Sequence, residues 1–218
     1  MHEQFIREYS IMIDSKDRNY QIYPNPFQYQ VRFGPISSCA DVTPIINNSF
    51  ANVRYIKLEK IVMPFYNCVT PDEDGLKINV LKPITNNSYT VLSLGSEYSN
   101  ENYLSTNDVL GDSFATIYFD QKQNMTHYLG QAPNGIKWFP RSNLGRINRF
   151  DIRFADPYGD LLNCPHLDKS ILSDMYCRCE DPEGDDYTDC FKHNIRHPLN
   201  PIFQHHLYFK IGVVQDNI

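Results

Sequence analysis

Strict alternation of apolar and polar residues between positions 27 and 33 constrains the fold of this chain more than any other feature. Phe27, Tyr29, Val31 and Phe33 alternate with Gln28, Gln30 and Arg32. Successive side chains of a β-strand point to opposite faces, so the pattern predicts a strand with one face on a core and the other in water. The preceding Tyr23-Pro24-Asn25-Pro26 turn fixes the start of this strand, because proline cannot donate to a β-ladder.

The same reasoning predicts eight or nine strands in all, with at most two short helices. Residues 53–63 are apolar on both faces, which is typical of a central strand covered on each side. Residues 76–81 and 89–94 flank a polar turn and predict a hairpin. The remaining candidates are short apolar or alternating segments at residues 11–13, 114–119, 136–139, 149–154 and 206–213.

The amino-acid composition agrees with an all-β protein that has long loops. The chain of 218 residues contains 15 Tyr, 13 Phe and 14 Pro but only 10 Gly. Tyrosine and phenylalanine favour pleated, half-buried surfaces, whereas proline stops helices and marks turns. This length suits one domain, so we expect a single antiparallel β-sandwich or jelly roll over residues 1–218 with a Cys/His-rich insertion at about 163–201.

Charge and motifs exclude several classes of function. Twenty Lys and Arg against 26 Asp and Glu give a net charge of −6, which predicts no nucleic-acid partner because phosphate contacts need basic residues. No run of eighteen apolar residues occurs, so we expect no membrane span. Dinucleotide-binding, Walker A, nucleophile-elbow and zinc-protease motifs are also absent, which predicts a protein that is not an enzyme.

One cluster of residues in the insertion has the chemistry of a metal site. Cys177, Cys179, Cys190 and His193 offer the thiolates and imidazole that a structural zinc site uses, and Cys164 or His166 could replace either end. The single residue between the first two cysteines is fewer than zinc sites usually have. Free thiols and disulfides therefore remain alternative interpretations of the same residues. No other cofactor is expected.

The first thirty residues resemble the opening of a protein family found in nucleocytoplasmic large DNA viruses. The resemblance rests on Ile13-Asp14-Ser15-Lys16-Asp17-Arg18-Asn19, followed by Ile22-Tyr23-Pro24-Asn25-Pro26 and Tyr29. Lys16 stands where the family more commonly has arginine. Residues 53–58, 144–154 and 156–160 and the His-rich start of the last strand are similar to later family segments in the same order.

The resemblance implies a single jelly roll, an antiparallel eight-stranded sandwich, that acts as a minor capsid or penton-type protein. The expected partners are the major capsid protein, other minor capsid proteins and further copies of the chain. The expected location is the capsid shell of a virion assembled in the host cytoplasm. Two other interpretations remain open at this stage. One is a carbohydrate-binding β-sandwich that uses tyrosines, asparagines and Trp138, and the other is a zinc enzyme built on the Cys/His insertion.

Overall fold

The computed structural model describes residues 4–35, 45–71, 79–84, 88–100, 104–122, 126–139, 144–164, 166–171 and 194–216. These residues form strands and short 3₁₀ turns but no α-helix. The strands are β1 (Gln4–Asp14), β2 (Gln28–Phe33), β3 (Ile45–Ile46), β4 (Phe50–Pro64), β5 (Tyr66–Pro71), β6 (Asn79–Pro83), β7 (Thr90–Ser93), β8 (Ala115–Lys122), β9 (His127–Gln131), β10 (Ile136–Trp138), β11 (Leu144–Ile147), β12 (Arg149–Ala155) and β13 (His206–Asp216).

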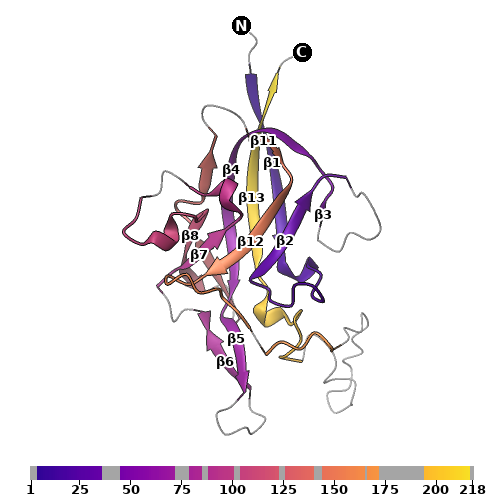
Figure 1. Cartoon of the computed structure of the whole chain (residues 1–218), viewed down its shortest axis with the longest axis vertical. Helices are drawn as coiled ribbons and strands as arrows, with labels where there is room; N and C mark the ends of the chain where they lie inside the picture. Colours follow the sequence, from indigo (N-terminus) through magenta and orange to yellow (C-terminus); the bar gives the residue numbers. More distant parts are fainter. Residues whose placement is uncertain are drawn as a thin grey trace.

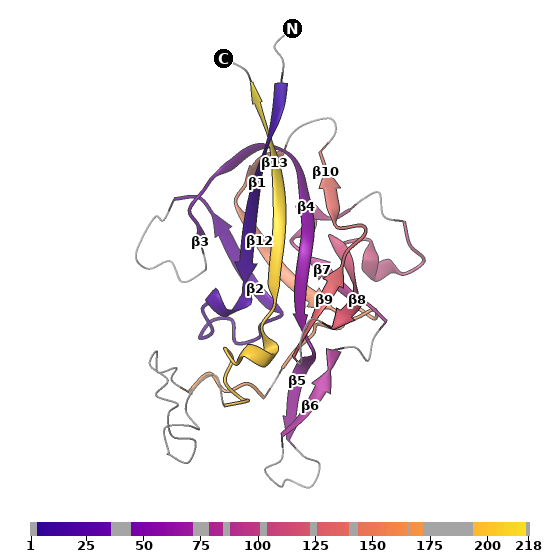
Figure 2. The ribbon, with the colours of Figure 1, turned by 180° about the vertical axis from the view of Figure 1, so that it is seen from behind.

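Eight of these strands form two facing layers in jelly-roll order. One layer contains β1, β13, β4 and β9, and the other contains β2, β12, β7 and β8. The β8–β9 pair joins the layers along one side, so the whole is one curled sheet (Figures 1 and 2). Pairing is antiparallel throughout these two layers, and the first and last strands of the chain are neighbours. The all-β jelly-roll class expected from the sequence is confirmed.

The core lies between the layers and takes alternate residues from each strand. Phe27, Tyr29, Val31 and Phe33 are at most 7% exposed, as their alternation predicts. They meet a largely aromatic and aliphatic set from the opposite layer, which includes Ile56, Leu207, Phe209 and Ile211. Burial of this much apolar surface supplies the main stabilising free energy of the fold.

Strand β4 has the central place that its sequence predicts. One of its edges pairs with β13, and the other pairs in turn with β11, β10 and β9. Its ribbon also arches over the end of the molecule where both chain termini lie (Figure 1). The predicted cover on both faces is wrong, because Lys57, Glu59 and Lys60 are exposed. The core residues Val53, Ile56, Leu58, Ile61 and Met63 change between odd and even positions where the register with β13 shifts, as a β-bulge makes them do.

Two sequence predictions need correction. The first strand is not confined to residues 11–13 but extends over Gln4–Asp14. The predicted hairpin of residues 76–81 with 89–94 is wrong, because β6 pairs with β5, whereas β7 pairs with β12 and β8. The turn between the two segments does not determine which strands they pair with, and β7 lies inside the second layer, between β12 and β8. Among the described residues, no helix has the length and apolar character needed to cross a membrane.

Candidate functional site

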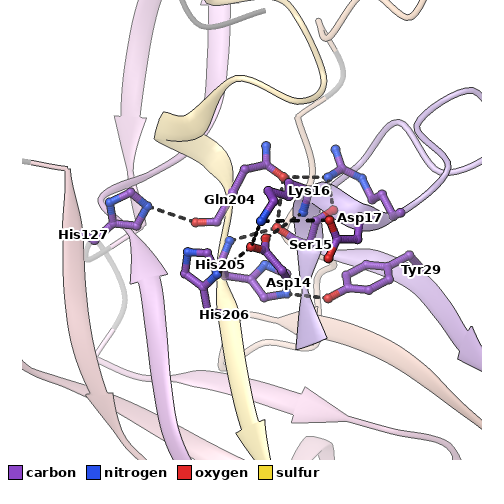
Figure 3. A network of polar contacts seen from close by, with 10 residues as sticks. Asp14, Ser15, Lys16, Asp17, Tyr29, His127, Gln204, His205 and His206 are labelled. Carbon is purple, nitrogen blue, oxygen red and sulfur yellow. Dashed lines mark hydrogen bonds and ion pairs between the residues drawn. The ribbon is translucent and has the colours of Figure 1, made fainter. Parts of the chain in front are cut away.

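A buried polar cluster lies where β1 ends and β13 begins (Figure 3). We call it the Arg18 clasp. The clasp comprises Asp14, Ser15, Lys16, Arg18, Tyr29, His127, Gln204, His205 and His206. Its first part has a local cause: the Asp14 carboxylate accepts a hydrogen bond from the Lys16 N–H (3.0 Å) and so caps the short 3₁₀ helix η1 (Ser15–Asp17). That turn directs Arg18 towards the end of the sandwich, where Arg18 is only 3% exposed.

Arg18 uses all five of its N–H donors on neutral oxygens. Nε donates to the Tyr23 carbonyl (2.8 Å), and the two terminal nitrogens donate to carbonyls of Ser15 (2.6 Å), Pro24 (3.0 Å) and Pro198 (2.6 Å) and to Gln204 Oε1 (2.7 Å). Burial lowers the pKa of Arg18 to about 10, so the side chain stays charged at neutral pH. A buried cation is tolerated when every donor is satisfied. Arg18 thus ties the Tyr-Pro-Asn-Pro turn to the segment before β13.

The Asp14 carboxylate accepts hydrogen bonds from two side chains as well as from the backbone. Lys16 Nζ lies 2.7 Å and His206 Nδ1 3.1 Å from Asp14 Oδ2. Burial alone would raise the pKa of Asp14, but the hydrogen bonds from His206 and Lys16 outweigh it and hold that pKa well below the ordinary range. The ionised carboxylate therefore pins the end of β1 to the first residue of β13.

His205 and Tyr29 connect the clasp to the core. The ring Nε2 of His205 and the hydroxyl of Tyr29 share a hydrogen bond of 3.0 Å, and both side chains are at most 1% exposed. The imidazole also packs against both Phe27 and Phe154, with ring centroids 5.9 and 4.7 Å away. Burial lowers the pKa of His205 to about 3 and raises the pKa of Tyr29 above its ordinary value, so both side chains are neutral.

His127 brings a fourth strand to the clasp. Its Nε2 donates to the Gln204 carbonyl (3.2 Å), and its Nδ1 contacts Thr126 Oγ1 at 2.8 Å. A carbonyl can only accept, so Nε2 carries the proton and Nδ1 of the neutral ring is the acceptor. The first residue of β9 is thereby fixed to the segment that leads into β13.

This geometry suits structural cohesion better than acid–base chemistry. A carboxylate with so low a pKa as Asp14 is a poor proton acceptor near neutral pH. Ser15 Oγ donates to Gln204 Oε1 (3.0 Å) and accepts from the His205 backbone N–H (2.9 Å), so no imidazole is placed to activate it. The clasp holds β1, β2, β9 and β13 together at one end of the sandwich.

A second feature is an open groove of about 600 Å³ on the solvent face of β2 and β12. Gln28, Gln30, Asp151 and Arg153 line it from the two strands, and the turn at residues 22–25 and the segment at 93–96 flank it. Amide, carboxylate and guanidinium groups can form hydrogen bonds in many directions. The groove therefore suits polar contacts with another molecule. It borders the clasp, because Tyr29 and the Tyr23-Pro24 turn that binds Arg18 are among its lining residues.

The metal-site residues that the sequence suggests, Cys177, Cys179, Cys190 and His193, lie outside the described residues. Of the two alternates, Cys164 is buried in a small apolar cluster with Phe203, whereas His166 is exposed. In the described part of the chain, no group of three or more His, Cys, Asp or Glu side chains could hold a metal ion. The zinc hypothesis for the insertion remains a prediction.

The clasp residues were visible in the sequence, but their role was not. Asp14, Arg18 and the Tyr-Pro-Asn-Pro turn carry the family resemblance, and the structure now gives a physical reason for them: the charge on Arg18 and the carbonyls of the turn bind each other. Gln204 and His205 had no local signal. The Asp-Ser-Lys-Asp-Arg segment is as polar as turns usually are, so its composition did not indicate a buried site either.

The fold and the clasp define a class, a jelly-roll protein whose first and last strands are locked together by buried polar side chains. No family model matches the chain. The chain is 52% identical to the uncharacterized protein L352 of Acanthamoeba polyphaga mimivirus, in an alignment 231 positions long that covers 97% of this chain and 79% of that protein. The chain therefore belongs to the same family as this mimivirus protein, and it is a giant-virus protein.

Proposed function

We propose that this chain is a non-enzymatic structural component of a large icosahedral virion, a minor capsid or penton-type protein that binds neighbouring capsid subunits. One observation carries the proposal, namely the jelly-roll strand order in a chain that belongs to a giant-virus family. Jelly rolls are a recurrent architecture of viral capsid proteins. Fold alone does not give function, so the proposal depends on the viral relationship as well.

The use of the polar side chains also supports a structural role. The clasp holds four strands together, and its carboxylate, hydroxyl and guanidinium each bind neighbours within the chain. A protein that carries load in a shell gains from strands that cannot separate at one end. We place it in the capsid shell, assembled in the host cytoplasm, with the major capsid protein and other minor capsid proteins as partners.

Quantitative mass spectrometry of purified particles of the virus that encodes this chain tests the proposal. We expect the chain at a fixed ratio to the major capsid protein in independent preparations, and we expect that ratio to survive washing with salt and mild detergent. Absence from the particles, or a ratio that falls with washing, would contradict a structural role.

One observation favours a second candidate, a carbohydrate-binding sandwich. Trp138 is 47% exposed and lies beside Tyr55 on the outer face of β10 and β4, with ring centroids 4.8 Å apart. Tyr55 is held in place by a hydrogen bond to Glu8. Exposed aromatic rings of this kind can stack on sugars. Glycan-array binding that is lost in Trp138→Ala but kept in Tyr158→Ala, whose side chain is 83% exposed in a turn, would favour this alternative.

A further inference from the structure

Strand β1 is the outermost strand of its layer, and one of its edges is open. All eleven residues of β1 pair with β13 without a bulge, from Gln4 opposite Asp216 to Asp14 opposite His206. No described strand pairs with the other edge. Such an edge presents a row of backbone N–H and C=O groups that can pair with another chain.

Apart from Arg7, a charged residue on the core side, the strand lacks the features that usually protect an exposed edge. Its sequence, Gln-Phe-Ile-Arg-Glu-Tyr-Ser-Ile-Met-Ile-Asp, contains no proline, no lysine and no glycine, and its register with β13 is regular. Natural proteins usually blunt long edges with lysine, proline or bulges, since an unprotected apolar edge invites association. Three exposed apolar side chains lie along it: Phe5 (45%), Ile6 (46%) and Met12 (52%).

The end of β1 also projects beyond the body of the sandwich. Strand β13 leaves β4 after Val213, so residues 214–216 pair only with β1 among the described strands. Figures 1 and 2 show this two-stranded ribbon standing out from the end of the molecule where the two termini lie. Two strands alone are marginally stable in water, and a third strand would cover Phe5 and Ile6.

We propose that the open edge of β1 receives an extended segment of another protein of the same virus, which adds to the sheet as a strand. The proposal rests on the structural function proposed above and names the surface through which the chain joins its neighbour. Main-chain hydrogen bonds would supply the pairing, and side chains on both faces would supply specificity.

The side chains of β1 specify what the partner strand carries, and they argue against a second copy. The faces alternate: Tyr9, which packs on Phe50 at 5.3 Å, and the buried Ile13 lie on the core side, together with Arg7. When two copies of β1 pair antiparallel as one continuous sheet, residues on the same face lie opposite one another. Arg7 would then meet only Phe5, Arg7, Tyr9, Ile11 or Ile13, none of which is acidic.

Glu8, on the outer face, would likewise find no basic residue in a second copy, although it already contacts Tyr55 and lies 3.8 Å from Lys210 within the chain. A strand from a different protein can satisfy both faces. Its expected chemistry is apolar residues opposite the ends of β1 and an acidic residue opposite Arg7, since opposite charges stabilise cross-strand pairs.

Site-specific photo-crosslinking tests the proposal. The full chain would carry a benzophenone amino acid at position 6 or at position 10, which share the outer face of β1, or at the control position 104, where Leu104 is 91% exposed away from this edge. Each version would be irradiated in an extract of infected cells, and the crosslinked peptides would be sequenced. We expect positions 6 and 10 to reach one segment of one other viral protein at residues four apart, because two paired strands advance by the same rise per residue.

A charged edge provides the matched variant. The double substitution Ile6→Lys with Met12→Lys should lower the crosslink yield from position 10 by at least about tenfold, because lysines on an edge oppose strand addition. Both side chains are about half exposed, so the thermal midpoint should stay unchanged. Leu104→Lys should leave the yield unchanged.

Crosslinks between two copies of β1, crosslinks without a register, or no yield above that of position 104 would overturn the added strand. These results are separable from the test of the structural function. A chain present in particles at a fixed ratio but without crosslinks from the edge would keep the structural role and refute the added strand. A chain absent from particles that still crosslinks in register would do the reverse.

Discussion

Arg18 Nη1 and Gln204 Oε1 lie 2.7 Å apart, although 186 positions separate the two residues in the chain. The same Gln204 oxygen accepts from Ser15 Oγ, and its amide nitrogen donates to the carbonyls of Pro198 (3.0 Å) and Asn200 (2.8 Å). The Gln204 side chain is thus shared between the first turn of the protein and the segment that leads into its last strand.

This contact has a topological meaning. In the jelly roll, β1 and β13 are neighbours, so the closing strand must find its place beside the first strand at the end of the chain. Hydrophobic burial alone decides which face of β13 points to the core, but it does not distinguish registers that differ by two residues. The polar contacts of Asp14 with His206 and of Arg18 with Gln204 are directional, and they fix one register at the end of both strands.

The first prediction concerns Arg18→Lys. Lysine keeps the charge but has three donors instead of five, so at least two of the five hydrogen bonds are lost. A hydrogen bond to a charged group contributes about 1.5–3 kcal/mol. We expect the free energy of unfolding, measured by urea denaturation, to fall by about 3 kcal/mol.

The matched control is Arg153→Lys. Arg153 is exposed on β12, and its replacement by lysine should change the free energy of unfolding by less than about 0.5 kcal/mol. A loss below about 1 kcal/mol for Arg18→Lys would mean that the clasp contributes little to stability.

Much of the fold follows from local patterns in the sequence. The alternating segment at residues 27–33 was predicted as a strand, and β2 covers Gln28–Phe33 with its apolar side buried, because alternation has a single structural solution next to a core. The central position of β4 was predicted correctly, but not for the right reason: its apolar residues at odd and even positions reflect register shifts with β13, not two covered faces. The partner of β7 could not be found in this way, because pairing between distant strands depends on the whole sandwich and leaves no trace in the neighbouring turn.

The clasp was less predictable for a physical reason. Its key residues are polar and lie near turns, where polar residues normally face water. Their burial depends on partners that lie 180 or more positions away in the sequence. His205 illustrates the difficulty. It directly precedes a strand of alternating residues, where nothing in the sequence indicates burial, yet it packs against Phe27 and Phe154. Only the family resemblance at residues 13–26 marked this end of the molecule as special.

The second prediction is that stability falls in mild acid. The unfolded chain protonates His205 at its ordinary pKa near 6.5, whereas burial lowers the folded pKa to about 3, so protons bind preferentially to the unfolded chain between these values. Stability is therefore greatest above pH 6.5 and decreases as the pH falls towards 3. From pH 7 to pH 5 we expect a loss of about 2 kcal/mol in the free energy of unfolding from this group.

Other titratable groups either lower stability in the same pH range or titrate below it. Burial also lowers the pKa of His127 and His197, which adds to the loss. Asp14 has a lowered pKa, so its contribution is lost only below its ordinary value near 3.8. Urea titrations at pH 7, 6 and 5 measure the effect. His205→Gln should flatten the profile, and the exposed control His166→Gln should keep it. A flat profile for the unmodified chain would contradict the buried neutral imidazole.

The third prediction uses two glycines that differ only in their surroundings. A Cβ on Gly130 in β9 would lie 2.7 Å from Cγ2 of Ile61 and 2.9 Å from Cγ2 of Ile117, inside the core, whereas a Cβ on Gly145 in β11 would meet no atom within 4 Å. Overpacking of a core typically costs about 1–3 kcal/mol, so Gly130→Ala should lower the free energy of unfolding by that amount. Gly145→Ala should leave it unchanged or raise it by up to about 1 kcal/mol, because alanine restricts the unfolded chain.

Urea denaturation of both variants under one set of conditions provides the measurement. Equal stability of the two variants would mean that β9 does not pack between Ile61 and Ile117, and the pairing of β4 with β9 and of β9 with β8 would have to be revised.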